Sequence, residues 1–568
     1  MQRASRQQVD SGASARQGSP VRGSVHVTKG RAEWRRWGNP VRFPAGVRNV
    51  VGVGAARRSL GILLALLLAG ACALLPVRPA GAAFTFVAAS ASPALPEPTP
   101  EHQPLDASGA ESPREPVKVA LIDTGVRPDR LPEGAKVEPG RNYVFDDRDT
   151  TDVVGHGTKI AGIILSIVPD VTLVPLVYYS QYPSGVPVNG GIEAMCRAMY
   201  DAIDVFGCRI VNVSSGVLVD DPALREALRY AEEKGVIVIS AVGNDRIAAP
   251  ERVFYPAGYE TVIGVGAADK DLGIARFSQV NSSVMVVAPG TDLEVLSIRG
   301  GSVTEKASGT SYAAAHVAAH AASLATAYPD MTPAEFRHVL RISAHDLGMV
   351  GYDETFGWGY VGASWPAGAL AYERMLRVKA LPFADVSVFD WFSDAVLEVY
   401  ERDLMLGESE SVFGPRSPVT FEVLAAALYR LRALHARLDS DDEAPATPDA
   451  CLDWAIQSGL LDRGDGPALD ASLSQWAAAP ITRDVVCAVL IEYCRYAGVE
   501  LPLVEPQAVT FVDIEQASDW TRDYIEIARA AGIIGGDGNG MFRPADVLCR
   551  AELATLLVRL VGMLEQAI

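Results

Sequence analysis

The sequence predicts an α/β domain with a parallel sheet and helices on both faces, followed by a mostly α-helical module of three repeats. Between residues 116 and 378, short β-branched apolar runs alternate with segments of helical spacing. From residue 379 onward the apolar spacing is helical, and three units of about 65 residues recur. The length of 568 residues leaves room for both parts and for a separate N-terminal region.

The N-terminal region differs from the rest in charge. Residues 1–58 carry 12 Lys/Arg against 2 Asp/Glu, whereas the remainder of the chain has a net charge of -29. We interpret residues 1–56 as a basic leader, which an over-extended start of translation would explain. The acidic remainder argues against nucleic acid as the main partner, because phosphate binding needs a basic surface.

Residues 57–82 have the order of a secretory signal peptide. Arg57-Arg58 precede an uncharged stretch over residues 59–77, and Ala80-Gly81-Ala82 offer small residues for cleavage. An uncleaved membrane anchor is the alternative, since 19 uncharged residues approach the length that spans a bilayer. A weaker alternative is a lipidated N-terminus attached at Cys72. Residues 83–115 are rich in Ala, Pro and Ser and form a linker, so any membrane contact is expected through the signal alone.

Six strands and the helices between them build the predicted sheet. Strands are expected at 117–122, 171–179, 209–213, 236–242, 262–265 and 284–287, and helices at 192–205 and 222–234. Apolar strands separated by helices favour a parallel sheet that is covered on both faces. Sites in such sheets form at the carboxyl ends of strands, so polar residues there are candidates for chemistry.

Three segments supply the groups that acyl transfer by a serine requires. They are Ile122-Asp123-Thr124-Gly125, Gly155-His156-Gly157-Thr158 and Gly309-Thr310-Ser311-Tyr312-Ala313. Ser311 would be the nucleophile and His156 its base, with Asp123 fixing the imidazole. Asn244, after another strand, would donate a hydrogen bond to the oxyanion. Each residue alone has a structural explanation as a cap or core group, but their joint occurrence does not.

These segments resemble the subtilisin-like serine proteases over about residues 117–370. Further matching motifs are Ala161-Gly162, Val213-Ser214-Ser215-Gly216, Ala241-Val242-Gly243-Asn244, Tyr255-Pro256-Ala257, Ala288-Pro289-Gly290 and Phe356-Gly357-Trp358-Gly359. The resemblance implies a subtilisin-like fold over 116–378, with Asp123, His156 and Ser311 as a catalytic triad and Asn244 as the oxyanion donor. It also implies that Ser214, Ser215 and Gly216 pair with the substrate backbone beside the pocket for the residue that precedes the scissile bond.

The chain departs from the family's pattern in places. Ala315 stands where the family has a proline, before His316, and no Asn-rich insertion follows the His156 helix. The usual calcium loop is therefore missing, and we expect no cofactor, with calcium as the one metal that the resemblance leaves open. The sequence has no Cys-x-x-Cys motif or Cys/His cluster that would suggest zinc. The six cysteines after the signal could form disulfides in fifteen different pairings. About 34 residues between signal and domain are too few for the family's prodomain, which leaves the route of maturation open.

Two rival interpretations of the site differ in class. An aspartic protease would explain Asp123-Thr124-Gly125, but that class uses two copies of the tripeptide and this chain has one. The other interpretation is a catalytically inactive subtilase fold that is kept as a surface or adhesion scaffold. The presence of all four polar groups of the site argues against it.

Residues 379–568 resemble three S-layer homology repeats. Their motifs are Phe383-Ala384-Asp385, Phe413-Gly414-Pro415, Thr482-Arg483, Phe511-Val512-Asp513, Phe542-Arg543-Pro544 and Arg550-Ala551-Glu552. The resemblance implies binding of an anionic secondary cell-wall polysaccharide. Because these residues carry 14 Lys/Arg against 31 Asp/Glu, binding would depend on a few placed cations, and Arg483 and Arg550 are the candidates. A helical packing module without ligand is the alternative.

Together these features predict a secreted serine endopeptidase that is associated with the cell wall or S-layer. Its expected partners are protein or peptide substrates and a wall polysaccharide.

Overall fold

The computed structural model describes residues 116–299, 303–435, 447–461, 477–501, 511–537 and 539–566. The leader, signal peptide and linker predicted for residues 1–115 lie outside the described residues. Among the helices of the described ranges, none has both the length and the apolar character needed to cross a membrane. The six cysteines in these ranges all carry free thiols, and five of them are buried.

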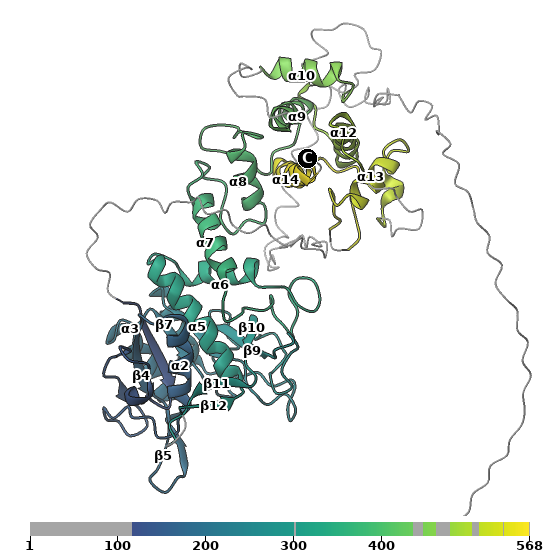
Figure 1. Cartoon of the computed structure of the whole chain (residues 1–568). Coiled ribbons are helices and arrows are strands. Elements are labelled where there is room, and N and C mark those ends of the chain that lie inside the picture. The colour runs from purple at the N-terminus through teal and green to yellow at the C-terminus, as the bar shows by residue number, and fades with distance from the viewer. Residues whose placement is uncertain are drawn as a thin grey trace, which may run out of the picture.

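One sheet organises the N-terminal domain (Figure 1). In spatial order its strands are β10 (Val286–Pro289), β9 (Ile263–Ala268), β8 (Ile237–Ala241), β7 (Ile210–Val213), β1 (Lys118–Asp123), β4 (Thr172–Val177) and β2 (Lys136–Val137), while β3 (Arg141–Asn142) also pairs with β4. Every pair in this sheet is parallel. The predicted parallel sheet is therefore confirmed.

Helices cover both faces of the sheet. On one face lie α2 (His156–Ile167), α5 (Thr310–Ala327), α6 (Pro333–Ser343) and α7 (Pro366–Lys379), which share one apolar core. On the other lie α3 (Gly191–Asp204) and α4 (Pro222–Glu233). The alanine-rich α5 is buried along most of its length, because small side chains let it pack closely against α2 and the central strands.

Two antiparallel hairpins extend the domain beyond the predicted elements. They are β5 (Tyr179–Gln181) with β6 (Pro187–Asn189), and β11 (Leu293–Leu296) with β12 (Thr304–Ala307). The single strand predicted at 171–179 is wrong at its end. Tyr178 donates its N–H to the Asp123 carbonyl, and its own carbonyl accepts from Gly190, so the chain leaves the sheet there and starts the first hairpin.

The C-terminal module is helical. Its helices are α8 (Ser393–Glu401), α9 (Phe421–His435), α10 (Pro448–Gln457), α12 (Arg483–Tyr496), α13 (Arg522–Ala530) and α14 (Arg550–Gln566). Figure 1 shows α9, α12 and α14 almost end-on around the centre of the module, and their inner faces share one apolar core. Two of them, α9 and α14, each begin six residues after the proline of a Phe-x-Pro motif, Pro415 or Pro544.

A ring of three main-chain hydrogen bonds joins the repeats. Val419 donates to the Leu548 carbonyl (2.8 Å), Leu548 to that of Ile481 (3.0 Å), and Ile481 to that of Val419 (2.9 Å). Each of these residues stands two positions before α9, α14 or α12, so the three sites are equivalent in the repeats.

The recurring Phe-x-Asp and Phe-x-Pro motifs are partners in two of the repeats. The Asp385 carboxylate accepts from the N–H groups of Phe413 and Gly414, both at 2.8 Å. Asp513 accepts in the same way from Phe542 (2.8 Å) and Arg543 (2.7 Å). Each aspartate therefore satisfies the main chain of a tight turn that would otherwise lack acceptors.

Candidate active site

The predicted site residues gather at the carboxyl edge of three neighbouring strands. Asp123 is the last residue of β1, Ser214 directly follows β7, and Asn244 comes three residues after β8. These strands lie side by side in the order β8, β7, β1. His156 and Ser311 stand in the first turns of α2 and α5, which pack against each other over that edge.

Asp123 and His156 are in direct contact. The Nδ1 atom of His156 lies 2.8 Å from Oδ1 and 3.0 Å from Oδ2 of Asp123, whose side chain is 2% exposed. An ionised carboxylate only accepts hydrogen bonds, so this contact places the imidazole proton on Nδ1 and leaves Nε2 as the acceptor. Burial lowers the pKa of His156, but the charge of Asp123 and its hydrogen bond outweigh this, and the pKa lies above its ordinary value.

A second buried carboxylate, Asp152, holds the turn that precedes His156. It is fully buried and accepts five hydrogen bonds. The donors are Thr124 Oγ1, the N–H groups of Val154 and Gly155, and the N–H and Oγ1 of Thr158, at 2.6–3.0 Å. The bond to Thr124 links this turn to the segment of Asp123. Asp152 was not predicted as a site residue, although its position four residues before His156 is a signal that the sequence contains.

Ser311 lies between the ends of β7 and β8. Its hydroxyl donates to the Ser214 carbonyl at 3.2 Å. Among the hydrogen bonds of the described residues, none joins Ser311 to His156, although the His156 ring lies 5.5 Å from that of the adjoining Tyr312. Catalytic hydrogen bonds are often loose without substrate, and proton transfer here requires the Ser311 hydroxyl to turn from the Ser214 carbonyl toward His156.

Asn244 is clamped against the first turn of α5. Its Oδ1 accepts from the N–H of Thr310 (2.9 Å) and from the Thr310 hydroxyl (3.0 Å). With Oδ1 held in this way, Nδ2 faces Gly309, where an added Cβ would lie 3.7 Å from it. Asn244 is exposed, and its amide can therefore donate to an oxygen that arrives next to Ser311.

The segment after β7 forms the other wall of the site. Asn212 Nδ2 donates to Ser214 Oγ at 2.7 Å, which fixes Ser214, and the chain continues through Ser215 and Gly216. Val217 then pairs with Tyr255 through two main-chain hydrogen bonds of 2.8 and 2.9 Å. The stretch from Ser214 to Gly216 is left at the edge of the site, where an extended peptide could lie alongside it.

The segment that would hold calcium in related proteins is short. α2 ends at Ile167 and β4 begins at Thr172, and the one carboxylate between them, Asp170, has a side chain that is 96% exposed. This connection does not fit an oxygen-rich calcium loop. In the described part of the chain, no group of three His, Cys, Asp or Glu side chains is arranged to hold a metal ion.

Comparison with known proteins agrees with this geometry. Residues 114–359 match the Subtilase family. Subtilisin DY of Bacillus licheniformis is 32% identical over 244 residues, which are 85% of that protein and 41% of this chain. The chain belongs to the subtilase family. Subtilisin BL of Lederbergia lenta is 31% identical over 258 residues, 89% of its length and 44% of this chain. The α/β domain of this subtilase is thus a subtilisin-like serine protease domain.

Two further comparisons concern a solved structure and the C-terminal repeats. The structure of fervidolysin from Fervidobacterium pennivorans, a keratinolytic enzyme related to subtilisin, aligns with 28% identity and a TM-score of 0.40 over 45% of this chain and 42% of that one. Residues 382–422 and 510–554 match the S-layer homology domain. The subtilase therefore also carries S-layer homology domains.

Arg550 does not take the position expected for a polymer ligand. The residue is 6% exposed, and its guanidinium donates to the carbonyls of Phe413 (2.9 Å) and Leu406 while lying over the Phe413 ring, 4.9 Å from its centroid. Two of its five N–H donors are used on main-chain oxygens, and burial keeps a polymer carboxylate from reaching the others. The geometry gives Arg550 a structural contact between repeats, and the expected polymer contact does not fit it.

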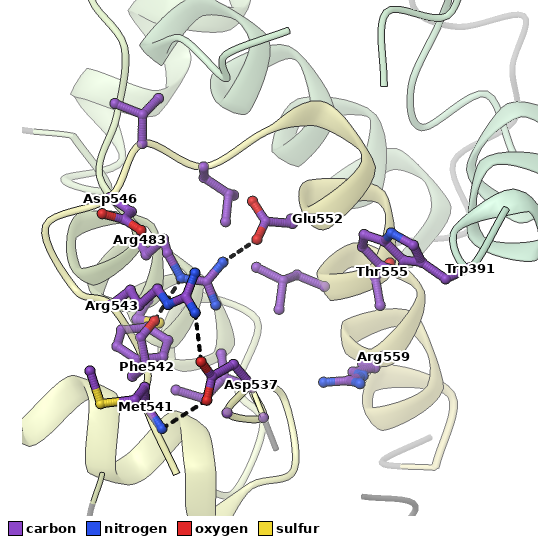
Figure 2. Close-up of a pocket in the computed structure, with 17 residues that line it drawn as sticks. Trp391, Arg483, Asp537, Met541, Phe542, Arg543, Asp546, Glu552, Thr555 and Arg559 are labelled. Atoms are coloured by element: carbon purple, nitrogen blue, oxygen red, sulfur yellow. Dashed lines mark hydrogen bonds and ion pairs between the residues drawn. The ribbon is translucent and has the colours of Figure 1, made fainter. Parts of the chain in front are cut away.

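Arg483 makes the equivalent contact in another pair of repeats, at the edge of a pocket (Figure 2). It donates to the Phe542 carbonyl at 2.9 Å, lies 5.0 Å from the Phe542 ring and forms an ion pair with Glu552. The pocket also contains Arg543, Arg559 and Trp391. Arg483 was predicted from the sequence but these three were not, because Trp391 belongs to the first repeat and the two other arginines to the third, and only the fold brings them together.

Proposed function

We propose that this subtilase is an exported endopeptidase that cleaves peptide bonds through an acyl-enzyme on Ser311. Ser311 Oγ attacks the substrate carbonyl while its proton passes to Nε2 of His156. The tetrahedral intermediate holds its negative charge toward Asn244 Nδ2 and the N–H groups at the start of α5. It then expels the amine, which takes the proton from His156. Water, deprotonated by the same imidazole, releases the acyl group.

One observation carries this proposal. Asp123 fixes the tautomer of His156 by contacts of 2.8 and 3.0 Å, next to a serine at a helix start and a clamped amide. A scaffold without activity has no need for a buried carboxylate aimed at a half-exposed imidazole, because such a charge costs free energy to bury.

Labelling with a fluorophosphonate probe tests the nucleophile. We expect the probe to modify Ser311, as mapped by mass spectrometry, and Ser311→Ala to abolish both labelling and peptide cleavage with almost unchanged thermal unfolding. Ser308→Ala is the matched control, since Ser308 lies in the loop before α5 and should retain both activities. Wild-type activity in Ser311→Ala would refute the mechanism and leave the inactive scaffold as the better interpretation.

We further propose that the repeats hold the protein at an anionic wall polysaccharide through the pocket of Figure 2. The guanidinium groups of Arg483, Arg543 and Arg559 approach it from two repeats, and Trp391 offers a ring that is 43% exposed. Sugars stack on aromatic rings and acidic substituents pair with arginines. The Arg543 side chain is 51% exposed, compared with 17% for Arg483, and within the described residues it forms an ion pair with Asp537 at 2.7 Å.

Co-sedimentation of the full chain with purified walls tests this anchoring. We expect wild-type protein to sediment with walls that carry an acidic polysaccharide, and Trp391→Ala or Arg543→Ala to weaken this clearly. Arg522→Ala is the control, because Arg522 is also ion-paired, with Glu515 and Asp519, but lies outside the pocket. Failure of the wild-type protein to sediment would favour the packing module without ligand.

A further inference from the structure

The main chain after β7 and the turn after β8 lie on either side of the space next to Ser311. A peptide whose carbonyl meets Ser311 Oγ and Asn244 Nδ2 must run past Ser214 and Gly216. The side chain on the acyl side of its scissile bond then points into the gap between Gly216 and Gly243. Gly243 belongs to the turn that carries Asn244, and its N–H lies 3.3 Å from Thr310 Oγ1, next to the nucleophile.

The ring of Phe254 occupies this gap. A Cβ added to Gly216 would lie 3.2 Å from Cβ and 3.5 Å from Cδ1 of Phe254. A Cβ added to Gly243 would lie 2.5 Å from Cε2 and 3.1 Å from Cγ of the same ring. The ring is therefore packed against the main chain of both walls, and the two glycines are what gives it room.

The main chain holds the ring in place from both sides. Tyr255, the next residue, pairs with Val217 through two hydrogen bonds, and the Phe254 carbonyl accepts from Gly258 at 2.9 Å. Two residues earlier, the Arg252 carbonyl accepts from Gln279 Nε2 (2.7 Å) and Asn281 Nδ2 (3.0 Å). These bonds fix the main chain on either side of Phe254, so the ring can leave the gap only by rotation about its own side-chain bonds, away from its contacts with the two glycines.

From this we infer that Phe254 restricts cleavage to peptide bonds that follow a small residue, Gly, Ala or Ser. A large apolar side chain on the acyl side would have to enter the volume that the ring fills, and overlap of this kind prevents the carbonyl from reaching Ser311. Phe254 is thus a specificity-determining residue. The inference rests on the proposed peptidase function and adds its substrate class.

Two fluorogenic peptides that differ only in Ala or Phe before the scissile bond provide the test. For the wild-type enzyme, we expect kcat/KM for the Ala peptide to exceed that for the Phe peptide by about 10–200-fold, the range for a change in pocket volume. Phe254→Ala should remove or invert this preference, mainly by accelerating cleavage of the Phe peptide, and Phe254→Leu should lie between.

Phe389→Ala is the matched control, because this ring is 49% exposed and packs on His338, away from the site. It should leave the ratio unchanged. An enzyme that is labelled at Ser311 but cleaves both peptides equally well, or whose ratio is unaltered in both Phe254 variants, would overturn this inference alone. A wild-type protein that is neither labelled nor able to cleave either peptide would overturn the proposed function and this inference with it.

Discussion

Replacing Asn244 by alanine separates transition-state stabilisation from substrate binding. Loss of one oxyanion donor in a subtilisin costs about 10²–10³ in kcat, or about 2.7–4 kcal/mol. Here the same substitution also removes the acceptor for the N–H and hydroxyl of Thr310, at 2.9 and 3.0 Å. Because Asn244 is exposed, water can replace it there, so the cost in the free energy of unfolding should be only about 1 kcal/mol.

Steady-state cleavage of a fluorogenic peptide with Ala before the scissile bond gives kcat and KM, and chemical denaturation gives stability. We expect kcat to fall by the full factor with KM almost unchanged, since the amide meets the oxygen mainly once it is charged. Thr310→Val is the companion variant, because it removes one of the two bonds that orient the amide but leaves the amide itself. It should cost up to about tenfold in kcat, while Thr310→Ser, which keeps the hydroxyl, should stay near wild type. A rise in KM at constant kcat in Asn244→Ala would refute this reasoning and make Asn244 a substrate-positioning residue.

Three further perturbations follow from the charges and contacts. His156 must be neutral to accept a proton, and Asp123 raises the pKa of His156 above its ordinary value of 6.5. The value of kcat/KM should therefore rise with pH through an inflection above 6.5, and Asp123→Asn should move this inflection to lower pH. A pH profile that Asp123→Asn does not shift would contradict this. Burial lowers the pKa of His316 to about 4, so protonation of this residue favours the unfolded state. The neutral His316 side chain contributes its full stability above pH 6.5. This contribution decreases by about 3 kcal/mol as the pH falls to 4. Denaturation of wild type and His316→Gln at pH 7 and pH 4 should show a smaller loss for the variant. Arg550→Ala should destabilise the C-terminal module by about 1–3 kcal/mol, because the Phe413 and Leu406 carbonyls lose their donor, whereas Arg522→Ala should change the unfolding midpoint little.

The sheet and the triad segments were predictable because local sequence carries them. Strands such as β7 and β8 are mostly apolar runs in which every residue is buried, and this pattern distinguishes them from exposed strands. Asp123 could be placed because it directly follows such a run, and the parallel arrangement then brings neighbouring strand ends together. The order of residues along the chain was sufficient for this step.

Contacts made across loops could not be predicted in the same way. Nothing in the neighbourhood of Phe254 in the sequence shows that its ring packs against Gly216 and Gly243, since this depends on how three loops fold over the strand ends. Arg550 illustrates the converse, because its motif suggested a ligand while its partners, Phe413 and Leu406, lie more than a hundred residues away in another repeat. A motif identifies the residue type but not the atoms that it will meet.

The ring of hydrogen bonds through Val419, Ile481 and Leu548 determines when the repeat module can fold as the chain is synthesised. A nascent chain that has not reached Leu548 has an open N–H at Val419 and an open carbonyl at Ile481, and it lacks α14, which supplies much of the shared core. The module can therefore close only when its last helix has been made, and it should then do so in one cooperative step. The protease domain, whose sheet and covering helices end at Lys379, has no such requirement. Folding of the catalytic part would precede that of the part we propose as its anchor, so a prematurely terminated chain would be an untethered protease.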